Sequence, residues 1–144
     1  VTSTNVGGEN KLASTRYSQQ PFVKVTRELS IDQLWTLRTT VKRIAPRSGA
    51  INIAIPTLNG EQIITGDIRM KNEQVAVTLP AGKNNFTWQS TIKKQPLLSL
   101  HANKNLPIIE QWQVIVSPSW HATLSGLPMI LGAQANDDYF SYLF

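Results

Sequence analysis

The sequence of 144 residues contains no cysteine, few charged residues and no long apolar run. Without cysteine, neither a disulfide scaffold nor a metal site built on thiolates can form. No run has the roughly 18 apolar residues of a membrane-spanning helix, and no signal-peptide pattern is present. Charged residues make up 16% of the chain, against about a quarter in an average globular protein. Hydroxyl and amide side chains take their place, and this composition favours β-structure over a helical bundle.

Signatures of catalysis are missing as well. The chain has no Gly-x-Ser-x-Gly turn, because Ser125–Gly126 lacks the preceding glycine. Gly7–Gly8 leads into no strand-turn-helix pattern that would cradle a phosphate. The only adjacent acidic pair, Asp137–Asp138, falls in a terminal loop, so no pair of carboxylates can be assigned to glycosidase chemistry. The sequence therefore predicts a protein without enzymatic activity and without a cofactor.

Four side chains could in principle form a metal site or an acid–base set, namely His101, His121, Glu110 and Asp67. They fall on separate predicted strands and lack the spacing of metal ligands. We interpret them as structural residues and predict no metal site.

Alternation of apolar and polar residues is the dominant pattern, and it places every second side chain on one face of a strand. In 35–45 a helix competes, because Ser30 with Gln33 resembles a capping box. The β-branched run 39–41 disfavours a helix, so we expect a strand after at most one helical turn. The predicted strands are 21–29, 35–45, 50–55, 62–65, 67–71, 74–79, 86–92, 97–102, 108–117 and 119–126.

Turn residues separate these segments. Residues 46–49 form a turn, Asn59–Gly60 a tight turn, and Asn72–Glu73 the turn of a hairpin. Loops are expected over 80–85 and 133–138. The spacing predicts an all-β fold of about nine or ten short strands in an antiparallel β-sandwich, immunoglobulin-like or jelly-roll-like, although the pattern leaves a closed barrel open.

We expect residues 1–20 to be a flexible polar tail or linker and 21–144 to be a single domain. The chain begins with Val1 and ends abruptly in an aromatic run, so we also expect it to be excised from a longer protein.

A basic stretch over residues 22–47 carries six basic side chains against Glu28 and Asp32, and it supplies most of the net charge of +5. One interpretation is a stripe that attracts anionic lipid headgroups, nucleic acid or acidic polysaccharide. The other is a solvated strand face or a protected edge strand, which we favour because the charges are spread along the segment. The basic residues are Lys24, Arg27, Arg38, Lys42, Arg43 and Arg47.

Three tryptophans, Trp88, Trp112 and Trp120, could stack on sugar rings if one sheet face exposed them together. Tryptophans that alternate with Val and Leu are more often part of the core, where burial of each ring contributes about 2–3 kcal/mol. We favour the core.

Several motifs between residues 39 and 128 carry a resemblance to a known group of proteins. They are T-x-V-x-R-I-A-P-R-S-G-A (39–50), I-P-x-L-x-G-E-x-I-x-T (55–65), F-x-W-Q-S (86–90), L-x-L-x-A (98–102), E-x-W-x-V-x-V-S-P-S-W-H (110–121) and S-G-L-P (125–128). This region resembles the β-sandwich segment of large, uncharacterised bacterial integral membrane proteins. The resemblance implies an extracytoplasmic, periplasmic domain of an inner-membrane protein, anchored by helices outside this chain, and it carries no catalytic residue.

Three hypotheses for function follow. The first is a non-enzymatic interaction or scaffolding domain, whose partner is another protein or the remainder of its parent. The second is a carbohydrate-binding module that stacks a glycan on exposed tryptophan. The third, a nucleic-acid-binding β-barrel that uses the basic stretch, is the least favoured of the three.

Overall fold

The computed structural model of the protein describes residues 20–100, 106–120, 131–135 and 140–143. These residues form strands and turns, which confirms the all-β prediction. Among them, no helix has the length and apolar character needed to cross a membrane. The strands in chain order are β1 (Phe22–Ile31), β2 (Trp35–Ala45), β3 (Ile51–Pro56), β4 (Glu61–Ile63), β5 (Met70–Lys71), β6 (Gln74–Leu79), β7 (Asn85–Ile92), β8 (Ile108–Val116), β9 (Leu131–Ala135) and β10 (Phe140–Leu143).

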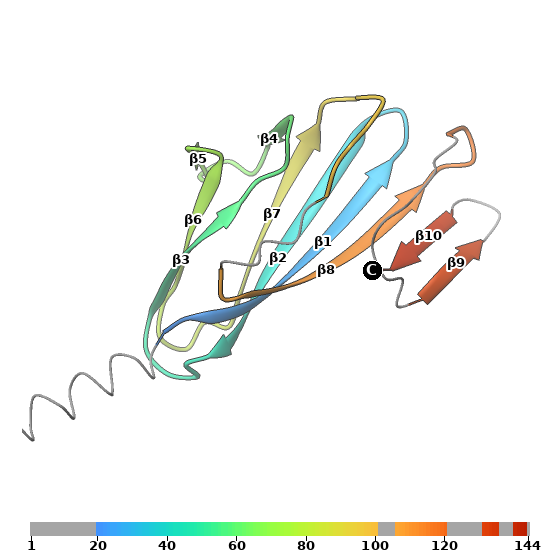
Figure 1. The fold of residues 1–144 in the computed structure, drawn as a ribbon. Helices are drawn as coiled ribbons and strands as arrows, with labels where there is room; N and C mark the ends of the chain where they lie inside the picture. Colours follow the sequence, from blue (N-terminus) through green and yellow to red (C-terminus); the bar gives the residue numbers. More distant parts are fainter. Residues whose placement is uncertain (1–19, 101–105, 121–130, 136–139, 144) are drawn as a thin grey trace, which may run out of the picture.

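The strands form two sheets that face one another (Figure 1). The larger sheet has seven strands in the order β4-β7-β2-β1-β8-β10-β9, and the smaller has three in the order β3-β6-β5. One cluster of buried side chains joins them, since it contains Val25 and Trp88 from the larger sheet and Ile55 and Val77 from the smaller. This is the two-layer arrangement that the sandwich prediction requires.

The larger sheet is mixed, which corrects the expectation of purely antiparallel sheets. β1 and β8 run parallel, with Arg27 opposite Trp112, whereas β1–β2 and β2–β7 are antiparallel. The physical reason lies in the connection after β7. The chain leaves β7 at Ile92 and enters β8 at Ile108, which lies opposite Val23 near the start of β1. There the backbone N–H of Val23 donates to the carbonyl of Pro107 at 3.2 Å. β8 therefore starts beside the beginning of β1 and runs parallel to it.

Alternation along the central strands decides which side chains are buried. Every second residue of β1 from Val23 to Leu29 is buried, and so is every second residue of β2 from Trp35 to Arg43. We call this the inner face of the larger sheet, because the smaller sheet packs on it. The helical turn considered after Ser30 does not form, since β1 continues to Ile31 and β2 begins at Trp35.

Two of the predicted turns have the backbone geometry that their residues favour. Asn72 and Glu73 both have positive φ, 53° and 59°, as a two-residue type I′ hairpin turn requires. Gly60 has a φ of 80° in the turn closed by the Glu61 N–H and the Leu58 carbonyl. The hairpin and the tight turn are therefore confirmed.

Other segments differ from the prediction. Residues 97–100 form no strand, because Leu98 packs against the apolar inner face and the segment lies over the sheet. Residues 133–135, expected in a loop, extend β9, which is held by pairing with β10. The predicted strand over 119–126 falls largely outside the described residues, as does the tail over 1–19.

Candidate functional site

A diagonal band of polar side chains crosses the inner face of the larger sheet. Register places Glu110 opposite Val25, Arg27 opposite Thr39, Ser90 opposite Leu37, and Glu61 opposite Ile92. All of these polar side chains are buried. We call the set Glu110, Arg27, Thr39, Ser90 and Glu61 the polar band.

The polar band divides the core into two apolar clusters. On β1, Val25 belongs to the cluster shared with the smaller sheet and Leu29 to the other, with Arg27 between them. On β2, Thr39 separates Val41 from Leu37 in the same way. The second cluster lies beyond the smaller sheet and is covered by loop residues that include Leu58 and Leu98.

Arg27 is the centre of the band and is 1% exposed. Its Nη2 donates to the carbonyl of Pro56 at 2.6 Å and lies 3.6 Å from Glu110 Oε1. Its guanidinium carbon lies 5.2 Å from the ring centroid of Trp112, within the range of a cation–π contact. Burial lowers the pKa of Arg27, and the nearby carboxylates of Glu110 and Glu61 offset part of that effect.

Glu61 closes the other end of the band and accepts three hydrogen bonds. The donors are Ser90 Oγ at 2.6 Å, the Leu58 N–H at 2.8 Å and the indole N–H of Trp88 at 3.3 Å. The bonds from Ser90 and Trp88 attach the short strand β4 to β7, and the bond from Leu58 holds the turn before β4. Since Arg27, Glu110 and Glu61 are all closed off from solvent, their ionic groups organise the interior and are not offered to a substrate.

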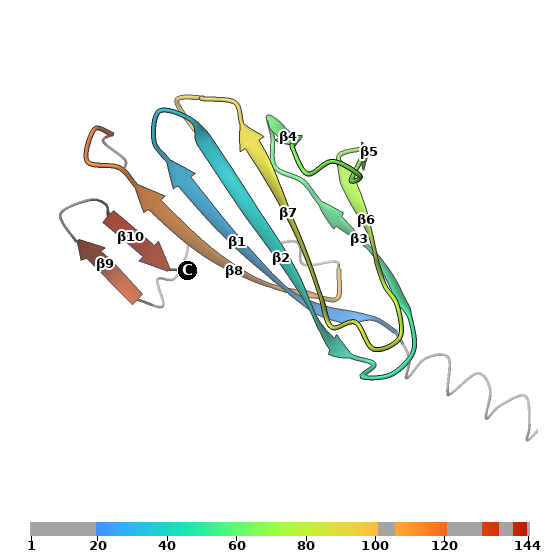
Figure 2. The ribbon, with the colours of Figure 1, turned by 180° about the vertical axis from the view of Figure 1, so that it is seen from behind.

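The outer face of the larger sheet has a different character. Figure 2 shows β7, β2, β1 and β8 side by side on this face, with the smaller sheet on the far side. Register aligns hydroxyl and amide side chains across the four strands, and one such row is Gln111, Thr26, Thr40 and Thr87. Thr40 and Thr87 share a hydrogen bond of 3.2 Å.

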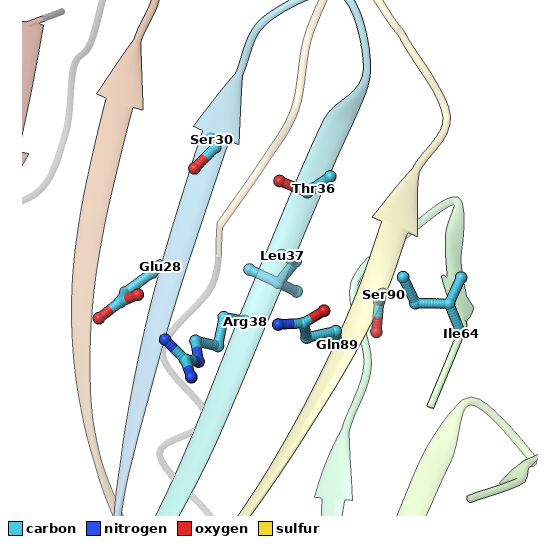
Figure 3. A pocket seen from close by; sticks show the side chains of 8 residues that line it. All are labelled: Glu28, Ser30, Thr36, Leu37, Arg38, Ile64, Gln89 and Ser90. Atoms are coloured by element: carbon cyan, nitrogen blue, oxygen red, sulfur yellow. The ribbon is translucent and has the colours of Figure 1, made fainter. Parts of the chain in front are cut away.

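A row of charged and amide side chains lies next to this hydroxyl row. Glu28 stands opposite Arg38, and Arg38 opposite Gln89; Figure 3 shows the three side chains projecting from neighbouring strands. They line a shallow hollow of about 230 Å³, whose remaining lining includes Ser30, Thr36 and Ile64. Apart from Arg38, which belongs to the basic stretch, these outer-face residues were not predicted as a site, although strand alternation alone places most of them on one face.

The structure does not bring the three predicted tryptophans to a common surface. Trp88 and Trp112 are 1% and 4% exposed and belong to the interior. Trp120 is half-buried, packs edge-on against Trp35 with ring centroids 5.8 Å apart, and contacts Lys94 through its ring face. The rings of Trp88 and Trp112 are therefore inaccessible to a sugar, in agreement with the core interpretation.

The basic stretch is split between the two faces of the larger sheet. Arg27 and Arg43 point inward and are buried, whereas Lys24, Arg38 and Lys42 lie on the outer face. The interpretation of the whole stretch as a solvated face is wrong for the two buried arginines. The alternation of inward and outward positions indicated their burial correctly, because both arginines occupy inward positions of their strands.

Of the four side chains considered for a metal site, Glu110 and Asp67 fall within the described residues. Glu110 is buried beside Arg27, and Asp67 is exposed in the loop before β5. His101 and His121 lie outside the described residues. Within the part of the chain that the structure describes, no three His, Asp or Glu side chains are grouped closely enough to hold a metal ion.

No protein-family model, no curated protein and no solved structure matches the chain.

Proposed function

We propose that this chain is a non-enzymatic interaction or scaffolding domain that binds a protein partner, or another part of its own parent protein, through the outer face of the larger sheet. The observation that carries the proposal is the alignment of polar side chains across β7, β2, β1 and β8, with the row of Glu28, Arg38 and Gln89 at its centre.

The chemistry of this face suits recognition of a protein surface. Hydroxyl and amide groups both donate and accept hydrogen bonds, so rows of Thr and Gln can pair with a polar partner without leaving unpaired charges. Glu28 and Arg38 carry opposite charges and lie opposite each other on adjacent strands. Such a pair favours one orientation of a complementary partner over others, since like charges placed against each other are costly.

The proposal also includes the cellular location of the domain. The resemblance of residues 39–128 to β-sandwich segments of bacterial integral membrane proteins supports a position outside the cytoplasm. On this view the outer face binds other periplasmic proteins or neighbouring segments of the parent.

No observation on the described residues favours either alternative function, the carbohydrate-binding module or the nucleic-acid-binding barrel. A glycan-stacking module needs exposed aromatic rings, and Trp88 and Trp112 are buried. A nucleic-acid-binding surface needs clustered cations, and burial of Arg27 and Arg43 removes two of them from the basic stretch.

Site-specific photo-cross-linking tests the proposal in cells that make the full-length protein. A photoreactive residue replaces Thr40 or Gln89 on the outer face, and the control replaces the exposed Thr78 on the smaller sheet. We expect one defined cross-linked product from the two outer-face positions and none from Thr78. Equal labelling at all three positions, or no product from Thr40 and Gln89, would contradict the proposal. Specific turnover by the purified domain in a broad hydrolase screen would contradict its non-enzymatic part.

A further inference from the structure

One end of the sandwich carries exposed leucines beside lysines. Leu34 lies in the turn between β1 and β2 and is 60% exposed, and Leu97 lies in the segment after β7 and is 77% exposed. They are the two most exposed large hydrophobic side chains of the described residues. A shallow hollow of about 550 Å³ lies at this end, lined in part by Leu34, Met70, Lys93 and Lys94.

The segment that carries Leu97 is held in place by the neighbouring turn. The Lys93 N–H donates to the Gly60 carbonyl at 3.0 Å, and Gln95 Nε2 donates to the Asn59 carbonyl at 3.1 Å. Leu98 packs into the second apolar cluster of the core. Because Leu98 is anchored inward, the adjacent Leu97 projects outward. Figure 1 shows this segment crossing the end of the sandwich from β7 towards the turn between β1 and β2.

The charges at this end favour an anionic partner. The two segments that carry the exposed leucines, residues 32–34 and 93–98, contain two lysines and one acid, Asp32. Glu61 also lines the hollow, but its carboxylate is buried and accepts three hydrogen bonds within the protein. Lys94 rests against the ring of Trp120, which holds its ammonium group at this end.

We propose that this end docks on the surface of an anionic lipid bilayer, with Leu34 and Leu97 entering the headgroup region and Lys93 and Lys94 contacting anionic headgroups. Two leucines that project from separate loops can both enter a soft, extended surface. Apolar side chains flanked by lysines are the combination that binds bilayer surfaces. The surface is distinct from the outer face described above, so the two proposals stand or fall separately.

A fluorescent label tests where the bilayer contacts the protein. The chain has no cysteine, so Leu97→Cys and Ile109→Cys each give one site for an environment-sensitive dye. Ile109 is the control because it is an exposed apolar residue on the outer face. With vesicles of mixed phosphatidylcholine and phosphatidylglycerol, we expect a blue shift of the dye at position 97 and none at 109. Equal shifts at both positions, or no shift at 97, would overturn the proposal.

Co-sedimentation with the same vesicles tests whether the two lysines at this end matter more than two basic residues elsewhere on the protein. Lys93→Gln with Lys94→Gln is expected to weaken binding about 30-fold. Arg38→Gln with Lys42→Gln removes the same charge from the outer face and is expected to weaken it far less. Equal losses would show attraction by net charge alone and would overturn the proposal.

The leucines are tested in the same assay by Leu34→Ser with Leu97→Ser, which is expected to lower binding to anionic vesicles. Sedimentation of the protein without lipid tests whether this end instead binds a second copy of the chain. If the chain self-associates and the leucine variant abolishes this, the end is a contact between copies of the chain, and the bilayer proposal fails.

Discussion

Arg27 and Glu110 lie on adjacent parallel strands, with Arg27 Nη2 3.6 Å from Glu110 Oε1 and both side chains closed off from solvent. Removal of a charge from water is expensive, and burial lowers the pKa of Arg27 despite the nearby carboxylates of Glu110 and Glu61. A buried ion pair often contributes little net stability, but removal of one partner leaves the other charge buried without compensation. Loss of one partner is expected to be worse than replacement of both.

The first prediction concerns this pair. Glu110→Gln leaves the buried Arg27 without its nearest counter-charge and is expected to lower the free energy of unfolding by about 3 kcal/mol. The double variant Arg27→Met with Glu110→Leu removes both charges and is expected to lose less than the single variant. Urea denaturation followed by tryptophan fluorescence measures both. Glu28→Gln, next to Arg27 on β1 but on the outer face, is the control and is expected to change stability by about 0.5 kcal/mol or less.

A double variant as unstable as Glu110→Gln alone would contradict this interpretation. It would mean that apolar side chains cannot replace the pair, and that the polar band contributes stability directly.

The second prediction concerns Arg43 at the end of β2. Its guanidinium donates five hydrogen bonds to backbone carbonyls, those of Pro46, Leu79, Pro80 and Lys83. Lysine keeps the charge but lacks the planar fork that reaches several carbonyls at once. Arg43→Lys is therefore expected to lower the free energy of unfolding by about 2 kcal/mol, measured by denaturation.

Arg38→Lys on the outer face of the same strand is the matched control, because its side chain is exposed. Equal stability of the two lysine variants would show that the hydrogen bonds of Arg43 do not stabilise the fold.

Much of the fold was predictable because alternation is a local property. It placed Leu37 and Val41 on the inner face and Arg38 and Lys42 on the outer face, and the structure has them there. The two buried arginines were missed for a different reason. Their charge was taken to require solvent, although each occupies an inward position of its strand. Most of their partners lie far along the sequence, Pro56 and Glu110 for Arg27 and Leu79, Pro80 and Lys83 for Arg43.

The features that were not predicted depend on contacts between segments that are distant in the sequence. The parallel pairing of β1 with β8 joins residues about 85 positions apart, and no local pattern encodes it. The outer-face rows likewise exist only once three or four strands are in register. Residues 97–100 have the composition of a strand, yet Leu98 is used to cover the second cluster, so tertiary packing overrides the local preference.

The third prediction concerns the hairpin turn at Asn72–Glu73. Both residues have positive φ, and Asn-Gly is the pair that a type I′ turn prefers. Glu73→Gly relieves the strain of a left-handed backbone and is expected to raise the free energy of unfolding by about 0.5–1 kcal/mol. Glu73→Val is expected to lower it, since a β-branched residue tolerates positive φ poorly. Thermal unfolding of the unmodified protein and the two variants measures the order of their stabilities. A valine variant as stable as the glycine variant would contradict the prediction.

The fourth prediction compares two glycines. At Gly60 the φ is 80°, and an added Cβ would lie 3.2 Å from the Cβ of Lys93. At Gly66 the φ is outside the left-handed region and an added Cβ would meet no atom within 4 Å. Gly60→Ala is therefore expected to lower the free energy of unfolding by about 1–2 kcal/mol. Gly66→Ala is expected to leave it unchanged or raise it by up to about 1 kcal/mol, because alanine restricts the unfolded chain. Denaturation midpoints of the two variants measure the difference, and similar midpoints would show that the turn at Gly60 can move away from Lys93 without cost.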